Sequence, residues 1–122
     1  VRKAPKNMED YLSSGHIGLS FLREFKGGID DTLKRQGQPR RVEISVSNFS
    51  TAGTYLRGTK MLVTLPALMR LTEMKDFASV PLPFQFSSGK MNMIWHQSYQ
   101  EDEQHKWLRK EMVEVVKSLP EK

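Results

Sequence analysis

The sequence predicts a layered α/β fold, in which helices lie on the faces of a β-sheet. Two observations carry this prediction. Apolar segments of strand length alternate along the chain with segments of helical periodicity. In addition, residues 16–21 are apolar almost throughout, which is typical of a strand buried in a parallel sheet. The length of 122 residues and the hydrophobic content of 38% fit one domain or part of a larger one.

The N-terminal segments are predicted to form a helix, a strand and a second helix. Asn7 is a candidate N-cap for a helix over residues 8–14, whose first turn carries two acids. The buried strand over residues 16–21 follows this helix. After a pair of glycines, residues 29–36 have the periodicity of an amphipathic helix, which Gly37 ends.

Two further strand–helix pairs are predicted in the middle of the chain. Apolar and polar residues alternate over 42–46, the pattern of a half-buried strand, and residues 49–57 are helical by pattern. A short apolar strand is predicted over residues 61–63. Because proline is tolerated in a first helical turn, residues 66–74, which begin with proline, are predicted to be the next helix.

The C-terminal segments are predicted to be extended over residues 80–84, a strand over 91–96 and then a long helix. Ser98 and Glu101 resemble a capping box for that helix, and Pro120 ends it. Its apolar side chains fall on one face, which predicts packing in a core or in a dimer. This apolar stripe consists of Trp107, Leu108, Met112, Val115, Val116 and Leu119.

Several function classes are disfavoured by what the sequence lacks. It contains no cysteine, and therefore no disulfide, thiolate metal site or cysteine nucleophile. It has no zinc-protease motif, phosphate-binding glycine loop or nucleophile elbow, so we expect no enzyme activity, no cofactor and no metal. No apolar run approaches about 18 residues and the N-terminus lacks a signal-peptide pattern, so we expect a cytoplasmic, soluble protein.

The chain is basic, with a formal net charge of +5. Basic residues gather at the N-terminus and in a second cluster around one turn. No aromatic residue is interleaved with the second cluster, so we predict a solvated basic loop, with nucleic-acid contact as the alternative. This second cluster consists of Lys34, Arg35, Arg40 and Arg41.

One segment has the residue types of a binding site. Ser47, Asn48 and Phe49 lie where a predicted strand runs into a predicted helix, and two more hydroxyl residues follow. Backbone N–H groups at a helix N-terminus, together with hydroxyls and an amide, can hold an anion, with simple N-capping as the alternative. His16 begins the buried strand, and cleft residues of open α/β sheets gather at strand ends. A packed, hydrogen-bonded histidine is the alternative there.

Five segments, in order and over nearly the whole chain, together resemble the effector-binding domain of LysR-type transcriptional regulators. The segments are Tyr11-Leu12 with Gly15-His16-Ile17, Arg40-Arg41-Val42 with Val46-Ser47-Asn48-Phe49, Thr59-Lys60-Met61-Leu62-Val63-Thr64-Leu65-Pro66, Leu82-Pro83-Phe84 with Met93-Ile94-Trp95-His96, and His105-Lys106-Trp107-Leu108-Arg109.

This resemblance implies a Rossmann-like layered sheet with flanking helices, similar to one lobe of a type 2 periplasmic binding protein. Residues 1–84 would form the second lobe of the effector-binding domain, and residues 85–122 the return strand and the C-terminal helix. The N-terminal winged helix-turn-helix and the first lobe would be absent from this chain.

The resemblance also implies a function, the sensing of a small-molecule inducer that is anionic or polar. Matching positions give inducer contacts at Ser47, Asn48 and Phe49, with Thr64 at the end of the next cleft-facing strand and His16 near the crossover between lobes. Operator DNA would be bound through the missing N-terminal domain and not by this chain, and self-association to a dimer or tetramer is expected. A stand-alone solute-binding lobe or a small α/β enzyme is the alternative.

Overall fold

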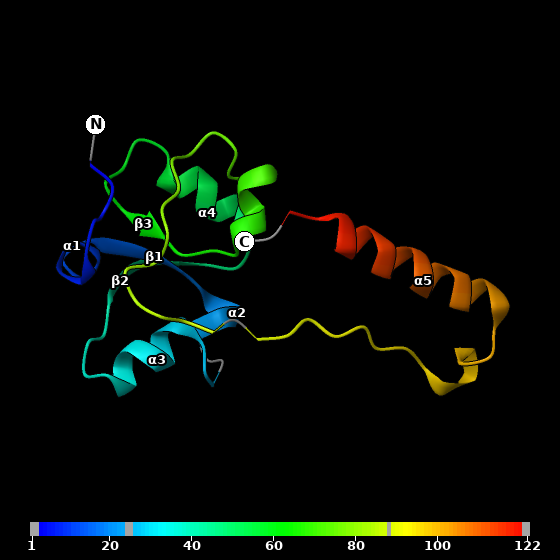
Figure 1. Cartoon of the computed structure of the whole chain (residues 1–122). Helices are drawn as coiled ribbons and strands as arrows, with labels where there is room; N and C mark the ends of the chain where they lie inside the picture. Colours follow the sequence, from blue (N-terminus) through cyan, green and yellow to red (C-terminus); the bar gives the residue numbers. More distant parts are fainter. Residues whose placement is uncertain (1–2, 24–25, 88, 121–122) are drawn as a thin grey trace. The chain divides into compact units, whose positions relative to one another are not determined.

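The structure is a computed structural model that describes residues 3–23, 26–87 and 89–120. It divides the chain into two units, Val1–Ser88 and Gly89–Lys122 (Figure 1). The first unit contains the sheet and the hydrophobic core. The second contains the last helix.

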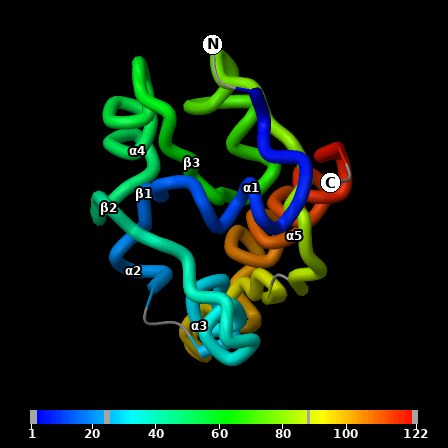
Figure 2. Tube along the Cα trace, turned by 90° about the vertical axis from the view of Figure 1, so that its left-hand side faces the viewer, coloured from blue at the N-terminus to red at the C-terminus, as the bar shows by residue number. Residues whose placement is uncertain are grey.

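Three parallel strands form the sheet of the first unit. They are β1 (Gly15–Leu19), β2 (Arg41–Val46) and β3 (Leu62–Val63). The strand order is β2-β1-β3, so β1 lies between the other two, as the trace in Figure 2 shows. All five residues of β1 are buried, which confirms the fully buried parallel strand that its apolar run predicts. Strand β2 is at the edge and alternates between exposed and partly or fully buried residues, as predicted.

Four α-helices and a 3-10 helix surround this sheet. They are α1 (Met8–Leu12), α2 (Ser20–Arg23), α3 (Ile29–Arg35), α4 (Phe49–Leu56) and η1 (Ala67–Leu71). Helix α4 contacts all three strands. Helices α3 and α4 lie on opposite sides of the sheet (Figure 1). The predicted layered α/β fold is therefore confirmed.

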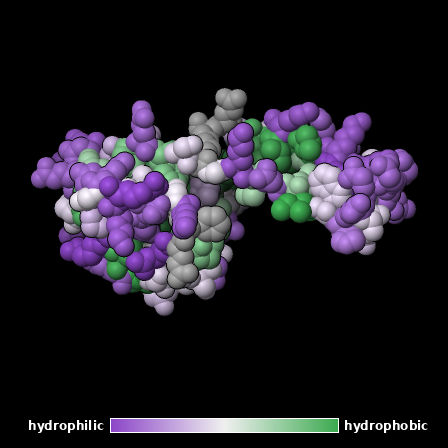
Figure 3. Space-filling view, turned by 90° about the horizontal axis from the view of Figure 1, so that it is seen from below, coloured by the Kyte–Doolittle hydropathy of each residue, from purple (hydrophilic) through white to green (hydrophobic). Residues whose placement is uncertain are grey.

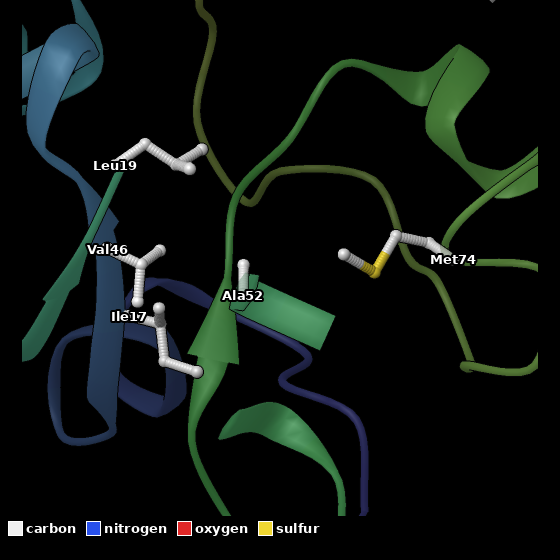
Figure 4. Packing of buried hydrophobic residues seen from close by; sticks show 5 residues of the cluster. All are labelled: Ile17, Leu19, Val46, Ala52 and Met74. Atoms are coloured by element: carbon white, nitrogen blue, oxygen red, sulfur yellow. The ribbon is translucent and has the colours of Figure 1, made fainter. Parts of the chain in front are cut away.

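The core lies between the sheet and α4. Ile17 and Leu19 of β1 and Val46 of β2 point toward Ala52 of α4, and Met74 reaches the same cluster from the segment that follows η1 (Figure 4). Tight packing also reaches the opposite face of β1. There a Cβ at Gly18 would lie 2.9 Å from a methyl group of Val42, so this position accepts only glycine without a shift of its neighbours.

Three predicted elements differ from the observed ones. The strand predicted over 16–21 ends at Leu19, because the chain turns at once into α2. The helix predicted over 66–74 is only the short 3-10 helix η1, since the backbone at Thr72 leaves the helical region, with φ −128° and ψ −108°. Residues 91–96 form no strand, because no strand among the described residues pairs with them and an extended segment needs such a partner.

The second unit contains η2 (Gln97–Tyr99) and α5 (Glu103–Ser118). The N-cap of α5 is Asp102, whose carboxylate accepts a hydrogen bond of 2.8 Å from the His105 backbone N–H. The capping box predicted from Ser98 is therefore wrong: Ser98 lies in η2, where its own N–H donates to the His96 ring. Asp102 competes better for the cap because its acceptor sits directly before the first helical residue.

The apolar stripe of α5 is exposed. Trp107 and Val116 have exposed fractions of 63% and 66%, and each of the other four residues has at least 40%. Figure 3 shows hydrophobic side chains at the surface of this unit. No core within the described part of the second unit covers the stripe, so the predicted core packing would need another part of the protein. Packing against a second copy stays a prediction.

Leu33 tests the layer formed by α3, because it is the one buried residue of that helix and has an exposed fraction of 0%. Leu33→Ala should lower the free energy of unfolding by about 2–5 kcal/mol, since it removes buried methyl groups and leaves a cavity. Urea denaturation followed by circular dichroism measures this. The control Leu71→Ala, at a half-exposed position, should stay within about 0.5 kcal/mol of the parent chain. Equal effects of the two substitutions would contradict the described packing of α3.

Candidate functional site

The segment between β2 and α4 forms a helix start with an ordinary side-chain cap. Asn48 has extended backbone geometry, and its side-chain oxygen accepts a hydrogen bond of 2.8 Å from the Thr51 backbone N–H. N-capping, the alternative interpretation, therefore holds for Asn48. Ser47 and Asn48 are nevertheless exposed, and Ser47 makes no hydrogen bond with the described side chains. The polar groups at this helix start remain accessible to a ligand.

Phe49 gives this segment an apolar wall. Its ring packs edge-on against Phe21 of α2, with ring centroids 5.7 Å apart. Phe49 is half-buried and also packs against the core cluster. Because α2 follows β1 and α4 follows β2, this aromatic pair lies where two neighbouring parallel strands end. An aromatic wall beside exposed polar groups is the usual construction of a small-molecule site.

Thr64 belongs to a second group of polar residues, which is held together by long-range hydrogen bonds. The hydroxyl oxygens of Tyr11 and Thr64 lie 2.8 Å apart. The Arg40 guanidinium donates to both of these oxygens through Nη1, at 3.4 Å each. The group thereby joins α1, the end of β3 and the residue before β2.

Asp30 of α3 completes this polar cluster, which we define as Tyr11, Asp30, Arg40 and Thr64. Arg40 donates to both Asp30 carboxylate oxygens, from Nε at 2.7 Å and from Nη2 at 3.0 Å. The side chain of Arg40 is only 5% exposed. Burial disfavours its charged form, but the hydrogen bond to Asp30 and the neighbouring charges outweigh this, so the pKa of Arg40 lies above its usual value. Arg40 is a permanent, fixed cation in this cluster.

His16 is completely buried, with an exposed fraction of 0%. Its Nε2 lies 2.8 Å from the Tyr11 carbonyl oxygen, and its ring stacks at an angle on the Tyr11 ring at 4.5 Å. Its surroundings match the packed, hydrogen-bonded histidine that the sequence leaves as the alternative. Any influence of His16 on a ligand would pass through Tyr11, which it supports.

The structure thus groups the predicted site residues in two places. Ser47, Asn48 and Phe49 lie at the carboxyl end of β2, while Thr64 and His16 both contact Tyr11. The sequence analysis missed Tyr11 and Asp30 as site residues and treated Arg40 as part of a solvated loop. The only available signal was the pattern of α1, where Tyr11 takes the buried position of a short polar helix.

The basic cluster of the sequence is largely neutralised by ion pairs. In addition to Arg40 with Asp30, Arg35 pairs with Asp31 at 3.1 Å and Arg41 pairs with Glu43 at 3.0 Å. These two exposed pairs contribute little to stability, but they lower the local positive potential. A strong phosphate-binding patch is therefore not formed by these three arginines.

An open polar depression of about 590 Å³ lies beside α2 and α3. Its lining residues are Ser20, Arg23, Lys26, Asp30, Asp31, Lys34 and Ser45. None of the predicted inducer contacts is among them. Within the described part of the chain, no group of three or more histidine, aspartate or glutamate side chains could hold a metal ion. No helix in that part is long and apolar enough to cross a membrane.

Comparison with known proteins finds similar proteins, several of which are named as helix-turn-helix transcriptional regulators. No family model matches the chain. The HTH-type transcriptional activator NagR of Ralstonia sp is 28% identical over 115 residues, which are 93% of this chain and 38% of NagR. NahR of Pseudomonas putida, also an HTH-type transcriptional activator, is 27% identical over 94% of this chain and 39% of its own length. Nodulation protein D 3 of Rhizobium leguminosarum bv. phaseoli is 31% identical over 92% of this chain and 38% of its own length.

A solved structure shares the fold. The regulatory domain of MexT, a transcriptional activator in Pseudomonas aeruginosa, matches with a TM-score of 0.77 and 24% sequence identity. The match covers 92% of this chain and 57% of that domain chain. This chain therefore spans about two fifths of the length of the curated relatives above and somewhat more than half of the solved domain.

The buried ion pair should dominate the stability of the polar cluster. Arg40→Met should lower the free energy of unfolding by about 2–3 kcal/mol, because among the described residues it leaves Asp30 with only the longer ion pair to Arg23, at 3.8 Å. The loss is below that of a fully buried pair, since the Asp30 side chain keeps 21% exposure. Thermal and urea denaturation measure it. The matched control Arg35→Met breaks an exposed pair and should cost less than about 1 kcal/mol; a larger loss in the control than in Arg40→Met would refute this ranking.

Proposed function

Because this chain is a homologue of LysR-type helix-turn-helix transcriptional regulators and matches their C-terminal part, we propose that it is the inducer-sensing part of such a regulator. In this proposal a small molecule binds beside the sheet of the first unit. Its binding controls how a separate N-terminal winged helix-turn-helix reads operator DNA. The full-length regulator would be cytoplasmic, without enzyme activity and without a cofactor.

The observation that carries the proposal is the sequence match to two HTH-type transcriptional activators over 93% and 94% of this chain, and a solved regulatory domain shares the fold over 92% of it. Only 57% of that domain is covered, which fits the expectation that residues 1–84 form one lobe and residues 85–122 return to another. The first lobe and the DNA-binding domain would then lie elsewhere in the full-length protein. An inducer would bind between the two lobes, so this chain would supply one wall of the cleft.

The wall that we propose combines the two groups of residues described above. Ser47 and the first turn of α4 offer hydroxyl and N–H donors, and Phe49 supplies an apolar surface. Thr64 adds a hydroxyl, which is hydrogen-bonded to the Tyr11 hydroxyl. His16 holds Tyr11 in turn through the hydrogen bond to its carbonyl oxygen. The N–H donors at the start of α4 favour an anionic or polar inducer.

The exposed apolar stripe of α5 is consistent with a partner in the full-length protein. Soluble proteins rarely leave so many large apolar side chains of one helix face in water. In our proposal the first lobe of the same regulator, or a second copy in a dimer or tetramer, covers this face.

Asn48→Asp tests the cleft without disturbing the helix. Aspartate caps a helix start as well as asparagine, so stability should be unchanged, but its charge should repel an anionic inducer. In the full-length regulator we expect the inducer concentration for half-maximal reporter transcription to rise about tenfold or more, which corresponds to about 1.4 kcal/mol.

The control for this variant is Asn48→Ser, which also keeps a capping oxygen but adds no charge. It should respond nearly like the parent regulator. If Asn48→Asp leaves the response to every tested organic acid unchanged at equal protein level, Asn48 does not face the inducer.

The isolated chain should bind DNA only weakly and without sequence preference. Three arginines of the basic cluster are engaged in ion pairs, and DNA reading is assigned to a domain outside this chain. Fluorescence anisotropy with a labelled operator and a scrambled duplex should give equal, salt-sensitive affinities weaker than about 1 μM. Nanomolar binding to the operator alone at physiological salt would overturn this assignment.

A further inference from the structure

We propose that Thr64 meets the inducer only as a hydrogen-bond donor, so that this point of the cleft selects ligands that present a carboxylate or carbonyl oxygen. The inference rests on the proposed function, because that proposal puts Thr64 in the cleft. It goes further by assigning the direction of each hydrogen bond in the polar cluster. That direction follows from which of its groups can donate and which can accept.

The direction of the hydrogen bond between Tyr11 and Thr64 is fixed by the buried position of Tyr11. Tyr11 is only 3% exposed, so water cannot accept its hydroxyl proton. The two side-chain groups within hydrogen-bond distance of this hydroxyl are the Thr64 hydroxyl and the Arg40 guanidinium. A guanidinium only donates, so Thr64 Oγ1 is the acceptor that the described residues offer. A buried donor left without an acceptor is costly, so Tyr11 donates to Thr64.

These hydrogen bonds use every lone pair with which the Thr64 hydroxyl oxygen could accept. Its oxygen has two lone pairs, and it receives one hydrogen bond from Tyr11 and one from Arg40 Nη1. What Thr64 can still offer is its own hydroxyl proton. Thr64 is only partly buried, whereas Tyr11 is buried, and no described acceptor takes this proton. A ligand that reaches Thr64 must therefore bring an acceptor.

Arg40 acts as a positioning residue in this arrangement. Two of its nitrogens are held by the Asp30 carboxylate at 2.7 and 3.0 Å, which fixes the plane of the guanidinium. The third nitrogen, Nη1, is thereby kept pointing at the two hydroxyl oxygens. Arg40 thus occupies one lone pair of Thr64 permanently and does not need to touch the ligand itself.

The first test reads the hydrogen-bond direction from stability alone, with the purified chain. Thr64→Val keeps the shape of the side chain but removes the oxygen that accepts the hydrogen bond of the buried Tyr11 hydroxyl. It should raise the equilibrium constant for unfolding about five- to thirtyfold. Tyr11→Phe removes the donor and leaves Thr64 bonded to Arg40 and to water, so its effect should be clearly smaller. The controls Thr54→Val and Tyr55→Phe lie at exposed positions and should have little effect.

The second test reads ligand preference by NMR titration of the same chain at millimolar concentrations. The probes are benzoate, which only accepts hydrogen bonds, and benzylammonium, which only donates them. Benzoate should shift the Thr64 resonances, and Thr64→Val should weaken benzoate binding about tenfold, as loss of a hydrogen bond to a charged group does. Binding of benzylammonium should be the same in both proteins. The general attraction of this basic chain for anions is the same in the parent chain and in Thr64→Val, so it cancels when benzoate binding to the two proteins is compared.

The outcomes separate this inference from the proposed function. An equal or larger stability loss in Tyr11→Phe overturns the assigned hydrogen-bond direction. The predicted stability difference without any benzoate effect at Thr64 keeps the direction but shows that Thr64 lies outside the cleft, so the proposed function fails at this residue. A benzylammonium affinity that depends on the Thr64 hydroxyl overturns the donor-only role. The predicted stability difference together with selective loss of benzoate binding supports both proposals.

Discussion

The structure of the first unit depends on one constraint, the complete burial of β1 between two strands and two layers of helix. Every side chain of β1 must be apolar, absent or fully hydrogen-bonded, because none can reach water. Ile17 and Leu19 satisfy this on the α4 side. On the other side Gly18 has no side chain, and the His16 ring bonds to the Tyr11 carbonyl oxygen. The position of α1, and with it the position of Tyr11, follows from the requirement to hydrogen-bond a histidine inside the sheet.

This constraint explains why the polar cluster exists at all. Tyr11 is held over His16, so its hydroxyl lies in a place where water is excluded and a partner must be provided. Thr64 provides the acceptor and Arg40 the second donor, and Asp30 then balances the charge of Arg40. Each partner comes from a different element of the first unit. The candidate site is therefore connected to the core by a chain of obligatory hydrogen bonds that begins at β1.

The sequence predicted the local features of this arrangement and missed the long-range ones. Strand burial, the cap at Asn48 and the end of α3 at Gly37 depend on neighbours a few residues away, and their patterns were correct. Tyr11 and Thr64 are 53 positions apart in the sequence, and the periodicity of local segments cannot predict a contact between residues so far apart. The errors at residues 66–74 and 91–96 have a related cause. Their local propensity was clear, but tertiary structure decided their conformation. Met74 packs into the core after η1 ends, and no described strand pairs with residues 91–96.

The two halves of the candidate site are therefore coupled to the fold to different degrees. Asn48 is held by one hydrogen bond within its own helix start, so a substitution that preserves the capping oxygen can change ligand contacts without changing the core. Thr64 shares its hydroxyl with α1 and with the residue before β2, so a change there alters ligand contacts and stability together. The coupling is reciprocal: a ligand that binds only the folded cluster at Thr64 also stabilises the contacts among α1, β2 and β3. A substitution at Thr64 therefore disturbs contacts between several elements, whereas one at Asn48 disturbs only the start of α4.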